Sequence, residues 1–345
     1  MQVFEEIQPF LSQQKPFVCY VKPNETVWNL LVQQNDEIIE FSNQAGFVFV
    51  PFHEGKQVVI PFEGNSFFQG NLDDLETKLA ENFTSKTNQK EAFENLVSKG
   101  ISAIQNDEFQ KVVLSRKIIL KKQISIVETF QNLISSYPTA FRYLFFHPNI
   151  GLWMGATPEQ LVKINQNQFE TVALAGTQLY SENVTWETKE IEEQQFVTDY
   201  IITKVKDKVN KLIITDYKTI KAGNLVHLKS FISGELTANF QANGLINTLH
   251  PTPAVCGLPK ENSIDFILKN EGYNRKYYAG FLGEYNKKNQ TDLFVNLRCL
   301  EVDNNDVVNI YVGCGITKDS NPEKEFIETE NKSMTMRNVL VSKTL

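Results

Sequence analysis

Two pairs of glutamates, each separated by two residues, are the side chains in this sequence best suited to chemistry. Glu190 and Glu193 lie in WETKEIEEQQF, and Glu325 and Glu328 lie in NPEKEFIETENK. Residues three apart share one face of a helix, so each helix would direct both carboxylates the same way. Carboxylate oxygens suit Mg²⁺, which also takes ligands from an anionic substrate. The spacing therefore indicates either a solvated acidic helix face or a magnesium site.

Glycines end two of the predicted strands. The segment YVGCGIT carries Gly313 and Gly315, and ALAGT carries Gly176. A glycine lets the backbone approach a ligand closely because it has no side chain. The helix predicted after Gly315 would present its N-terminus, which favours an anion. Neither segment has the GxGxxG pattern of dinucleotide-binding proteins. These glycines thus indicate either plain turns or a close approach to an anionic ligand.

A proline-rich loop, HPTPAVCGLP at residues 250–259, carries one of only four histidines. Prolines fix the backbone, so three of them in ten residues predict a rigid loop. Such a loop either has a structural role or presents His250 to a ligand.

The composition restricts the class of protein. The chain has 345 residues, 41% of them hydrophobic, and a net charge of −7. It lacks the clustered Lys and Arg of a nucleic-acid-binding protein, and no apolar run approaches the roughly 20 residues of a membrane span. The acidic segment MQVFEEIQPFLSQQ does not resemble a signal peptide. We therefore expect a cytoplasmic protein with neither a nucleic-acid nor a membrane partner, and its unpaired cysteines predict reduced thiols.

The elements that must position these residues are closely spaced strands with single helices between them. This pattern predicts a layered α/β fold with largely antiparallel sheets rather than βαβ repeats. Ser320 followed by Glu323, with Pro322 between them, predicts the start of the last helix as a capping box. The helices are predicted at 86–106, 127–136, 186–210, 240–248 and 322–341. The strands are predicted at 17–21, 47–51, 58–61, 111–120, 141–146, 169–173, 226–236, 293–300 and 307–312.

No Gly- or Ser-rich linker divides the chain, so residues 1–345 are predicted to form a single domain. The strand-rich part at 1–85 carries no recognisable chemistry, and its expected role is to complete the sheets and the core. The chemistry lies within residues 90–340.

In their order along the chain, eight segments resemble the chorismate-utilising enzymes. This family includes isochorismate synthase, salicylate synthase, and the large subunits of anthranilate and aminodeoxychorismate synthases. Eight segments in the same order make a specific match over about residues 90–340. The segments are QKVVLSR at 110–116, GATPEQL at 155–161, ALAGT at 173–177, KEIEEQ at 189–194, HPTPAVCGLPK at 250–260, RKYYAGFLGE at 275–284, VNLR at 295–298 and GCGITKDSNPEKEFIETENK at 313–332.

The resemblance implies one α/β domain with large antiparallel sheets packed together and helices outside, and a Mg²⁺ site in its central cleft. It implies that Glu193 and Glu328 bind the metal, with Glu190 and Glu325 as their water-mediated partners. Four glutamates would repel dianionic chorismate strongly in a low-dielectric cleft. The glutamates therefore fit this substrate only together with a divalent cation. The residues implied to surround the substrate are Gly176, Thr177, His250, Tyr278, Arg298, Gly313, Gly315 and Lys332.

Lys111 distinguishes the subclasses. Family members that make isochorismate or salicylate have a lysine at this place in KVVLSR, and the ammonia-using members do not. The reaction needs a base to activate water for attack at C2 and an acid to help the C4 hydroxyl leave. The resemblance assigns these roles to Lys111 and Glu159. An efficient glutamic acid catalyst has its pKa raised toward about 6–7.

Isochorismate synthase is the predicted activity, in a pathway to menaquinone or a catecholate siderophore and without an obligatory protein partner. The HPTPAV loop is more similar to isochorismate synthases than to salicylate synthases. Two positions depart from the family, namely Cys256 in place of glycine and Gln194 where many relatives have histidine. The alternatives are a salicylate synthase, an ammonia-dependent synthase with a glutaminase subunit, and a chorismate-binding scaffold without activity.

Overall fold

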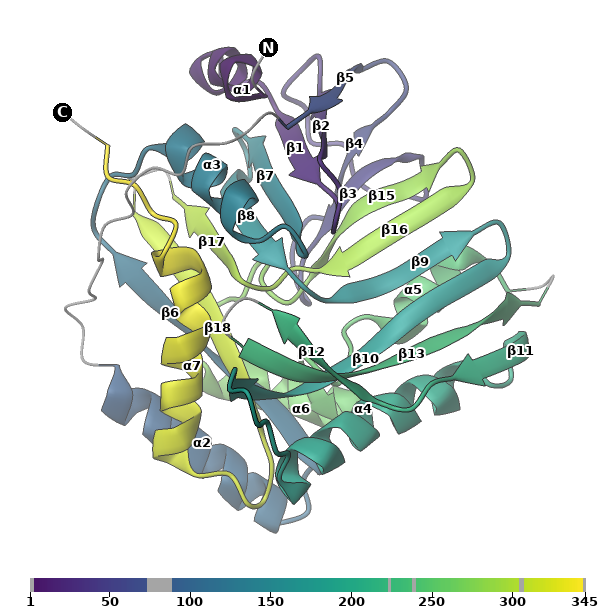
Figure 1. The fold of residues 1–345 in the computed structure, drawn as a ribbon, viewed down its shortest axis with the longest axis vertical. Coiled ribbons are helices and arrows are strands. Elements are labelled where there is room, and N and C mark those ends of the chain that lie inside the picture. The colour runs from purple at the N-terminus through teal and green to yellow at the C-terminus, as the bar shows by residue number, and fades with distance from the viewer. Residues whose placement is uncertain (1–2, 73–88, 223–224, 238–239, 304–306, 344–345) are drawn as a thin grey trace.

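Two antiparallel sheets stacked on each other form the body of the molecule (Figure 1). The computed structural model describes residues 3–72, 89–222, 225–237, 240–303 and 307–343. The first sheet has the order β14 (Gly257–Leu258), β6 (Lys111–Leu120), β18 (Val308–Ile316), β17 (Cys299–Val302), β8 (Gly151–Thr157), β7 (Phe141–His147), β1 (Phe17–Val21), β2 (Val27–Val32) and β5 (Ser66–Asn71). The second has the order β11 (Val209–Ile214), β13 (Leu225–Leu236), β10 (Gln168–Leu179), β9 (Gln160–Asn165), β16 (Gln290–Val295), β15 (Phe281–Lys287), β3 (Gly46–Val50) and β4 (Val58–Pro61), and β12 (Lys218–Ala222) also pairs with β13.

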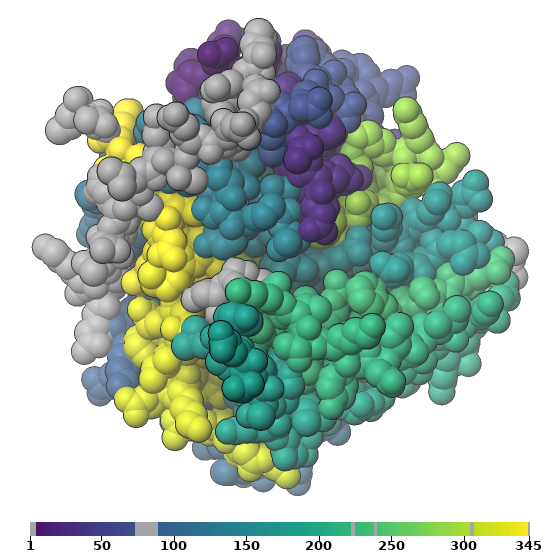
Figure 2. All heavy atoms as spheres, in the orientation of Figure 1, coloured from purple at the N-terminus to yellow at the C-terminus, as the bar shows by residue number. Residues whose placement is uncertain are grey.

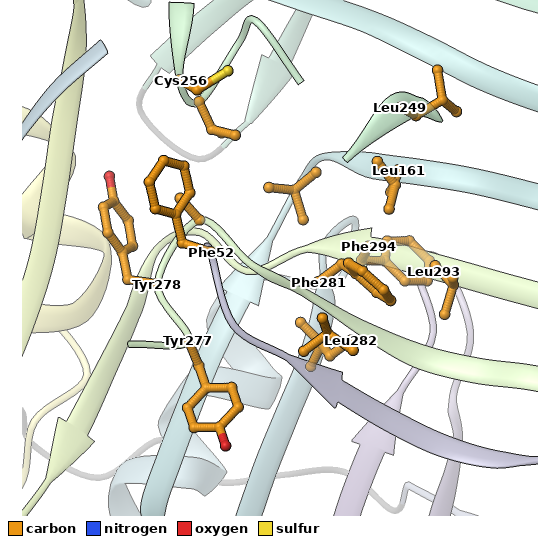
Figure 3. Close-up of a cluster of buried hydrophobic side chains, with 14 of the residues drawn as sticks. Phe52, Leu161, Leu249, Cys256, Tyr277, Tyr278, Phe281, Leu282, Leu293 and Phe294 are labelled. Atoms are coloured by element: carbon orange, nitrogen blue, oxygen red, sulfur yellow. The ribbon is translucent and has the colours of Figure 1, made fainter. Parts of the chain in front are cut away.

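Strand β1 in the first sheet is apolar on both faces, and both faces are covered. In β1, Val18 and Tyr20 join the core between the sheets, whereas Phe17, Cys19 and Val21 join a second core on the outer face. Side chains alternate between the faces of a strand, so a continuous buried run such as FVCYV supplies both cores. Figure 3 shows part of the core between the sheets, where Leu161, Phe281, Leu282, Leu293 and Phe294 lie close together.

Helices cover the outside of the sheets. Helices α2 and α7 pack together against β6 and β18, and α4 packs on β10 and β13 (Figure 1). In Figure 2 the yellow surface of α7 borders the teal and green surface of α4 and the second sheet. No helix in the described part of the chain is long and apolar enough to cross a membrane. The helices are α1 (Val3–Ser12), α2 (Lys90–Gln105), α3 (Ile126–Ser136), α4 (Thr188–Val205), α5 (Ala242–Leu249), α6 (Lys260–Asn270) and α7 (Pro322–Arg337).

The N-terminal strands complete both sheets, as the sequence predicts. β1, β2 and β5 extend the first sheet beyond β7, and β3 and β4 extend the second beyond β15. The expected antiparallel two-sheet architecture is therefore confirmed, and the expected strands at 17–21, 58–61 and 111–120 have the observed bounds. The first residues of the helix expected at 86–106 lie outside the described residues, and α2 is described from Lys90.

Several boundary predictions are wrong. The strands expected at 169–173 and 307–312 do not end at their glycines but continue to Leu179 and Ile316, and the helix expected at 322–341 ends at Arg337. The strand expected at 293–300 is two strands, because after β16 the chain leaves the second sheet and joins the first as β17. The helix expected at 186–210 ends at Val205, and β11 begins at Val209. The last helix has Asn321 as its N-cap, not Ser320, since the Asn321 side chain accepts a hydrogen bond from the Lys324 N–H. The Ser320 hydroxyl instead accepts one from the Thr317 N–H.

Candidate active site

A pocket opens between β10, β18 and the chain segment that crosses from β16 to β17. Its empty volume is about 640 Å³, the open mouth included. Backbone and side chains from both sheets and from α4 and α7 line it, so the folded chain brings together residues that are far apart in the sequence. The predicted residues among the lining are Glu159, Gly176, Thr177, Glu193, Tyr278, Arg298, Gly313, Gly315 and Lys332.

The absence of a side chain at Gly315 makes room for an ion pair. A Cβ atom at this position would lie 2.2 Å from Glu193 Oε1 and 3.2 Å from Lys111 Cε. Lys111 begins β6, its side chain is fully buried, and its Nζ lies 2.9 Å from Glu193 Oε1. Lys111 Nζ has this ion pair and no further hydrogen-bond partner among the described residues. Glu193 lines the pocket and Lys111 does not, so the amine lies next to the pocket through its contact with Glu193.

Glu193 is ionised at neutral pH. Burial alone would raise the pKa of this carboxyl, but Lys111 and Lys189 outweigh burial and lower the pKa to about 2. A carboxylate in this state can bind a cation without first losing a proton. Glu193 reaches the pocket from α4, where the next residue, Gln194, donates a hydrogen bond of 3.0 Å to the Ala173 carbonyl of β10.

The pKa of Glu159 is shifted in the opposite direction from that of Glu193. It lies in the short connection between β8 and β9 and is only 4% exposed. Burial raises the pKa of Glu159 to about 7, against the lowering effect of Lys111, Lys332 and Arg298. Its backbone is fixed, because its carbonyl accepts a 2.9 Å hydrogen bond from the Val295 N–H. A carboxyl that keeps its proton up to neutral pH can act as a general acid, as the sequence predicts.

Cationic and aromatic groups line another part of the pocket. Lys332 on α7 lies 2.7 Å from Glu328 Oε1 and donates a 3.0 Å hydrogen bond to the Gly313 carbonyl. Arg298 lies in the crossing segment with a φ of +48°, a backbone conformation that non-glycine residues adopt mainly at special sites. The ring of Tyr278 is stacked on Tyr311 with centroids 5.5 Å apart. This set of groups can bind an anionic ring compound.

Glu190, Glu325 and Glu328 line an adjoining, more open pocket that shares Thr177 with the first. Glu325 and Glu328 each form an ion pair with a lysine. Glu325 lies 2.5 Å from Lys189 Nζ, and Glu328 pairs with Lys332. The Glu190 carboxylate accepts a 3.1 Å hydrogen bond from the Glu187 N–H and so caps its own helix.

The chemistry of the carboxylate oxygens suits a magnesium ion, but their arrangement in this structure does not form a complete binding site. Glu325 is 1% exposed and its Oε2 has no hydrogen-bond partner within the described residues. A buried carboxylate oxygen without a partner, close to other carboxylates, suits a hard cation. In the part of the chain that the structure describes, however, no three His, Cys, Asp or Glu residues are grouped as a metal-binding set. The Mg²⁺ site therefore remains a prediction.

His250 lies away from the pocket. Its Nε2 is 3.1 Å from the Pro51 carbonyl oxygen, and its ring contacts Phe281 edge-on with centroids 4.9 Å apart. Burial lowers the pKa of His250 to about 4, so the ring is neutral. The proline-rich loop instead contributes Ala254 and Val255 to the pocket lining. The observed position gives His250 a packing role and does not support its predicted contact with the substrate.

His227 lines the pocket and was missed by the sequence analysis. It is 4% exposed, and its Nδ1 lies 3.1 Å from the Gly176 carbonyl and 3.2 Å from Thr177 Oγ1. Its Nε2 has no hydrogen-bond partner in the described ranges. Burial, together with the cations Arg298 and Lys332, lowers the pKa of His227 to about 3, so the ring is neutral and can donate or accept a hydrogen bond. The one sequence signal was a histidine interrupting the apolar run LVHL.

Comparison with known proteins gives consistent matches. The family model described as chorismate binding enzyme matches residues 63–341. Anthranilate synthase component 1 of Archaeoglobus fulgidus is 27% identical over 267 residues, which are 72% of this chain and 62% of that protein. Isochorismate synthase DhbC of Bacillus subtilis is 28% identical over 269 residues, covering 72% of this chain and 67% of that protein. The match thus spans about two thirds of the length of these relatives.

A solved structure shares the fold over almost the whole chain. The crystal structure of DhbC from Bacillus anthracis has a TM-score of 0.80 with 22% sequence identity. The alignment covers 97% of this chain and 99% of that chain. The architecture of two stacked sheets with outer helices is therefore common to both.

Proposed function

Because the chain belongs to the chorismate-binding enzyme family, we propose that it is an isochorismate synthase that requires Mg²⁺. One observation carries this proposal. Lys111 Nζ contacts Glu193, which lines the same pocket as Glu159, a buried carboxyl whose pKa is raised to about 7. A base and an acid in one pocket are what the exchange of a hydroxyl group between two ring carbons requires.

The reaction adds one water molecule and releases another. Lys111 first gives a proton to solvent, and its neutral Nζ then accepts a proton from water as the water oxygen forms a bond to C2 of chorismate. The ring double bonds shift, and the bond between C4 and its hydroxyl breaks. Glu159 gives its proton to that hydroxyl, which leaves as water. Proton exchange with solvent then restores both side chains.

The dianionic substrate needs positive charge in the pocket. Lys332 and Arg298 supply two cations at the lining, and the stacked ring of Tyr278 offers an apolar surface to the substrate ring. Glu193 and Glu328 would hold Mg²⁺, with Glu190 and Glu325 around them. A metal held there would offset the charge of these carboxylates and supply a positive centre for a substrate carboxylate. His227 can exchange a hydrogen bond with a substrate hydroxyl through Nε2.

A second candidate is an ammonia-dependent synthase, because relatives named anthranilate synthase component 1 reach 27% identity. In such an enzyme ammonia replaces water as the nucleophile. Lys111 at the base position favours water, as the family resemblance implies. The two candidates differ in the atom that is attached to C2.

Product identification separates these candidates. The purified protein is incubated with chorismate and Mg²⁺, with and without ammonium, and the products are separated by liquid chromatography with mass detection. We expect isochorismate, with no change on adding ammonium and no product in EDTA. Salicylate as the main product, or an amino product with ammonium, would replace the proposed activity. Binding of chorismate without any product would indicate a scaffold.

A further inference from the structure

Lys189 lies next to the carboxylates of the two Glu-x-x-Glu motifs. It lies in the first turn of α4, directly before Glu190, and its Nζ is 2.5 Å from Glu325 Oε1 on α7. Its side chain is 21% exposed, whereas the Glu325 side chain is 1% exposed. The contact therefore joins the two helices that carry the glutamate pairs, and it lies at the border between the buried site and the open adjoining pocket.

Glu325 is the carboxylate that Lys189 contacts directly, and it is the proposed partner of the magnesium ligands Glu193 and Glu328. Those two carboxylates lie beside lysines of their own, Glu193 beside Lys111 and Glu328 beside Lys332. Lys189 therefore supplies the positive charge next to Glu325. A lysine and a divalent cation that both draw on Glu325 must compete.

Lys189 borders open space into which its side chain can move. Lys189 lines the adjoining pocket together with Glu187 and Glu192, residues that the inner pocket does not contact. The Lys189 side chain is already 21% exposed, so the ammonium group has a route to solvent. The remaining Glu325 oxygen, Oε2, has no hydrogen-bond partner among the described residues, so Lys189 compensates this carboxylate only in part.

We propose that Lys189 is a tethered counter-cation that neutralises Glu325 in the metal-free protein and is displaced when Mg²⁺ binds. Its charge weakens the binding of Mg²⁺ and stabilises the protein without metal. This inference rests on the proposed magnesium site. If the inference holds, the protein stays folded at low Mg²⁺ because the Lys189 ammonium group takes the place of the metal ion.

The test measures metal affinity and stability rather than turnover. Metal-free wild type, Lys189→Met and the control Lys206→Met are titrated with Mg²⁺ by isothermal calorimetry. The control removes the same charge from the exposed residue that follows the far end of α4. Each protein is also melted without metal. We expect Lys189→Met to bind Mg²⁺ about tenfold more tightly and to melt at a lower temperature than wild type, with Lys206→Met unchanged in both.

The salt dependence adds a second readout. The difference in affinity between wild type and Lys189→Met should shrink as salt concentration rises, because it is a charge effect. If Lys189→Met does not fold, Lys189→Gln keeps a hydrogen-bond donor for Glu325 and carries the same expectation. Equal or weaker Mg²⁺ binding by the folded variant would overturn the inference, since Lys189 would then support the ligands. Wild type that binds no Mg²⁺ would instead overturn the proposed cofactor itself.

Discussion

Two groups of buried charges in this molecule differ in how completely they are paired. The first, which we call the structural cluster, comprises Tyr20, Lys22, Glu284, Lys287 and Asp292. Glu284 accepts hydrogen bonds from Tyr20 and Lys287 and lies 2.5 Å from Lys22 Nζ, which also lies 3.2 Å from Asp292. Within the described residues, no buried nitrogen or oxygen of this cluster lacks a partner. The cluster joins β1 of the first sheet to β15 and β16 of the second.

The candidate active site leaves polar atoms without partners. In the described part of the chain, His227 Nε2 and Glu325 Oε2 have no hydrogen-bond partner, and Lys111 Nζ has only its ion pair with Glu193. Burying a polar atom unpaired costs free energy, so such atoms are expected where a ligand completes the site. The difference indicates that the structural cluster contributes to folding and that the pocket contributes to binding. Variants in the two regions should therefore affect different measurements.

The largest effect on turnover is expected for Lys111→Met. Methionine keeps the apolar stem but has no basic nitrogen, so water is no longer activated. Loss of a general base lowers rates by about 10²–10⁴-fold. Isochorismate formation measured by chromatography should fall by that factor, while circular dichroism stays like wild type. A folded variant with wild-type turnover would place the base elsewhere.

Gly315→Ala should reduce turnover by about 10²-fold, because small misplacements of catalytic groups have effects of that size. The new methyl group would collide with Glu193 Oε1 and displace the Lys111 pair. Gly100→Ala in α2 is the control, since its Cβ would lie 3.1 Å from the Leu114 side chain, which can shift. Initial rates of both variants test this, and equal rates in the two would contradict the close approach at Gly315.

The pH dependence of kcat/KM should follow the protonation of Glu159. Because the pKa of Glu159 is raised to about 7 and the reaction needs its proton, kcat/KM should decline above pH 7. The decline should approach tenfold per pH unit. Rates from pH 6 to pH 9 provide the measurement, and Glu159→Gln should be slow at every pH without this decline. A wild-type rate that is constant between pH 7 and pH 9 would argue against Glu159 as the acid.

Glu284→Gln should have the smallest effect on turnover and a clear effect on stability. It leaves Lys22 and Lys287 without their shared carboxylate, and breaking a buried pair costs about 3 kcal/mol or more when the remaining charge stays buried. Because these lysines are each about a quarter exposed, the cost should lie at or below that value. Urea unfolding measures it, and reduced turnover in the folded variant would contradict the division between the regions.

Acid should weaken the structural cluster in the wild type. Burial would raise the pKa of Glu284, but Lys22 and Lys287 reverse this and lower it below its ordinary value of 4.5. The cluster therefore stabilises the fold above pH 4.5 and loses that stabilisation as pH falls through the lowered pKa. Glu284→Gln should lose less stability than wild type over this acidic range in the same unfolding measurement.

Elements with a strong local pattern were predictable from the sequence, and features that depend on the position of a distant strand were not. The apolar run of β6 was sufficient to predict both ends of that strand correctly. The run VNLRCL reads as one strand, because nothing local marks the change from one sheet to the other that brings Arg298 to the pocket. Ser320 and Asn321 are both good N-caps, and only the folded backbone decides between them.

The residues of the candidate site also fall into those that a local sequence pattern predicts and those that it does not. Glu193 and Glu328 belong to spaced motifs, so their helices could be recognised. His250 stands in a conspicuous loop but contacts Pro51, whereas His227 is inconspicuous in its strand yet lines the pocket. Which of the two histidines reaches the pocket depends on how β13 pairs with the irregular part of β10 near Gly176. That pairing is a tertiary property without a local signal.

Isotope labelling tests the central claim most directly, namely that Lys111 and Glu159 add one water and release another. Chorismate is converted by the wild type in H₂¹⁸O with Mg²⁺, and the product is analysed by mass spectrometry. We expect isochorismate with one ¹⁸O atom in its C2 hydroxyl and no such product from Lys111→Met. Unlabelled isochorismate, or labelled isochorismate formed equally well by Lys111→Met, would contradict the account.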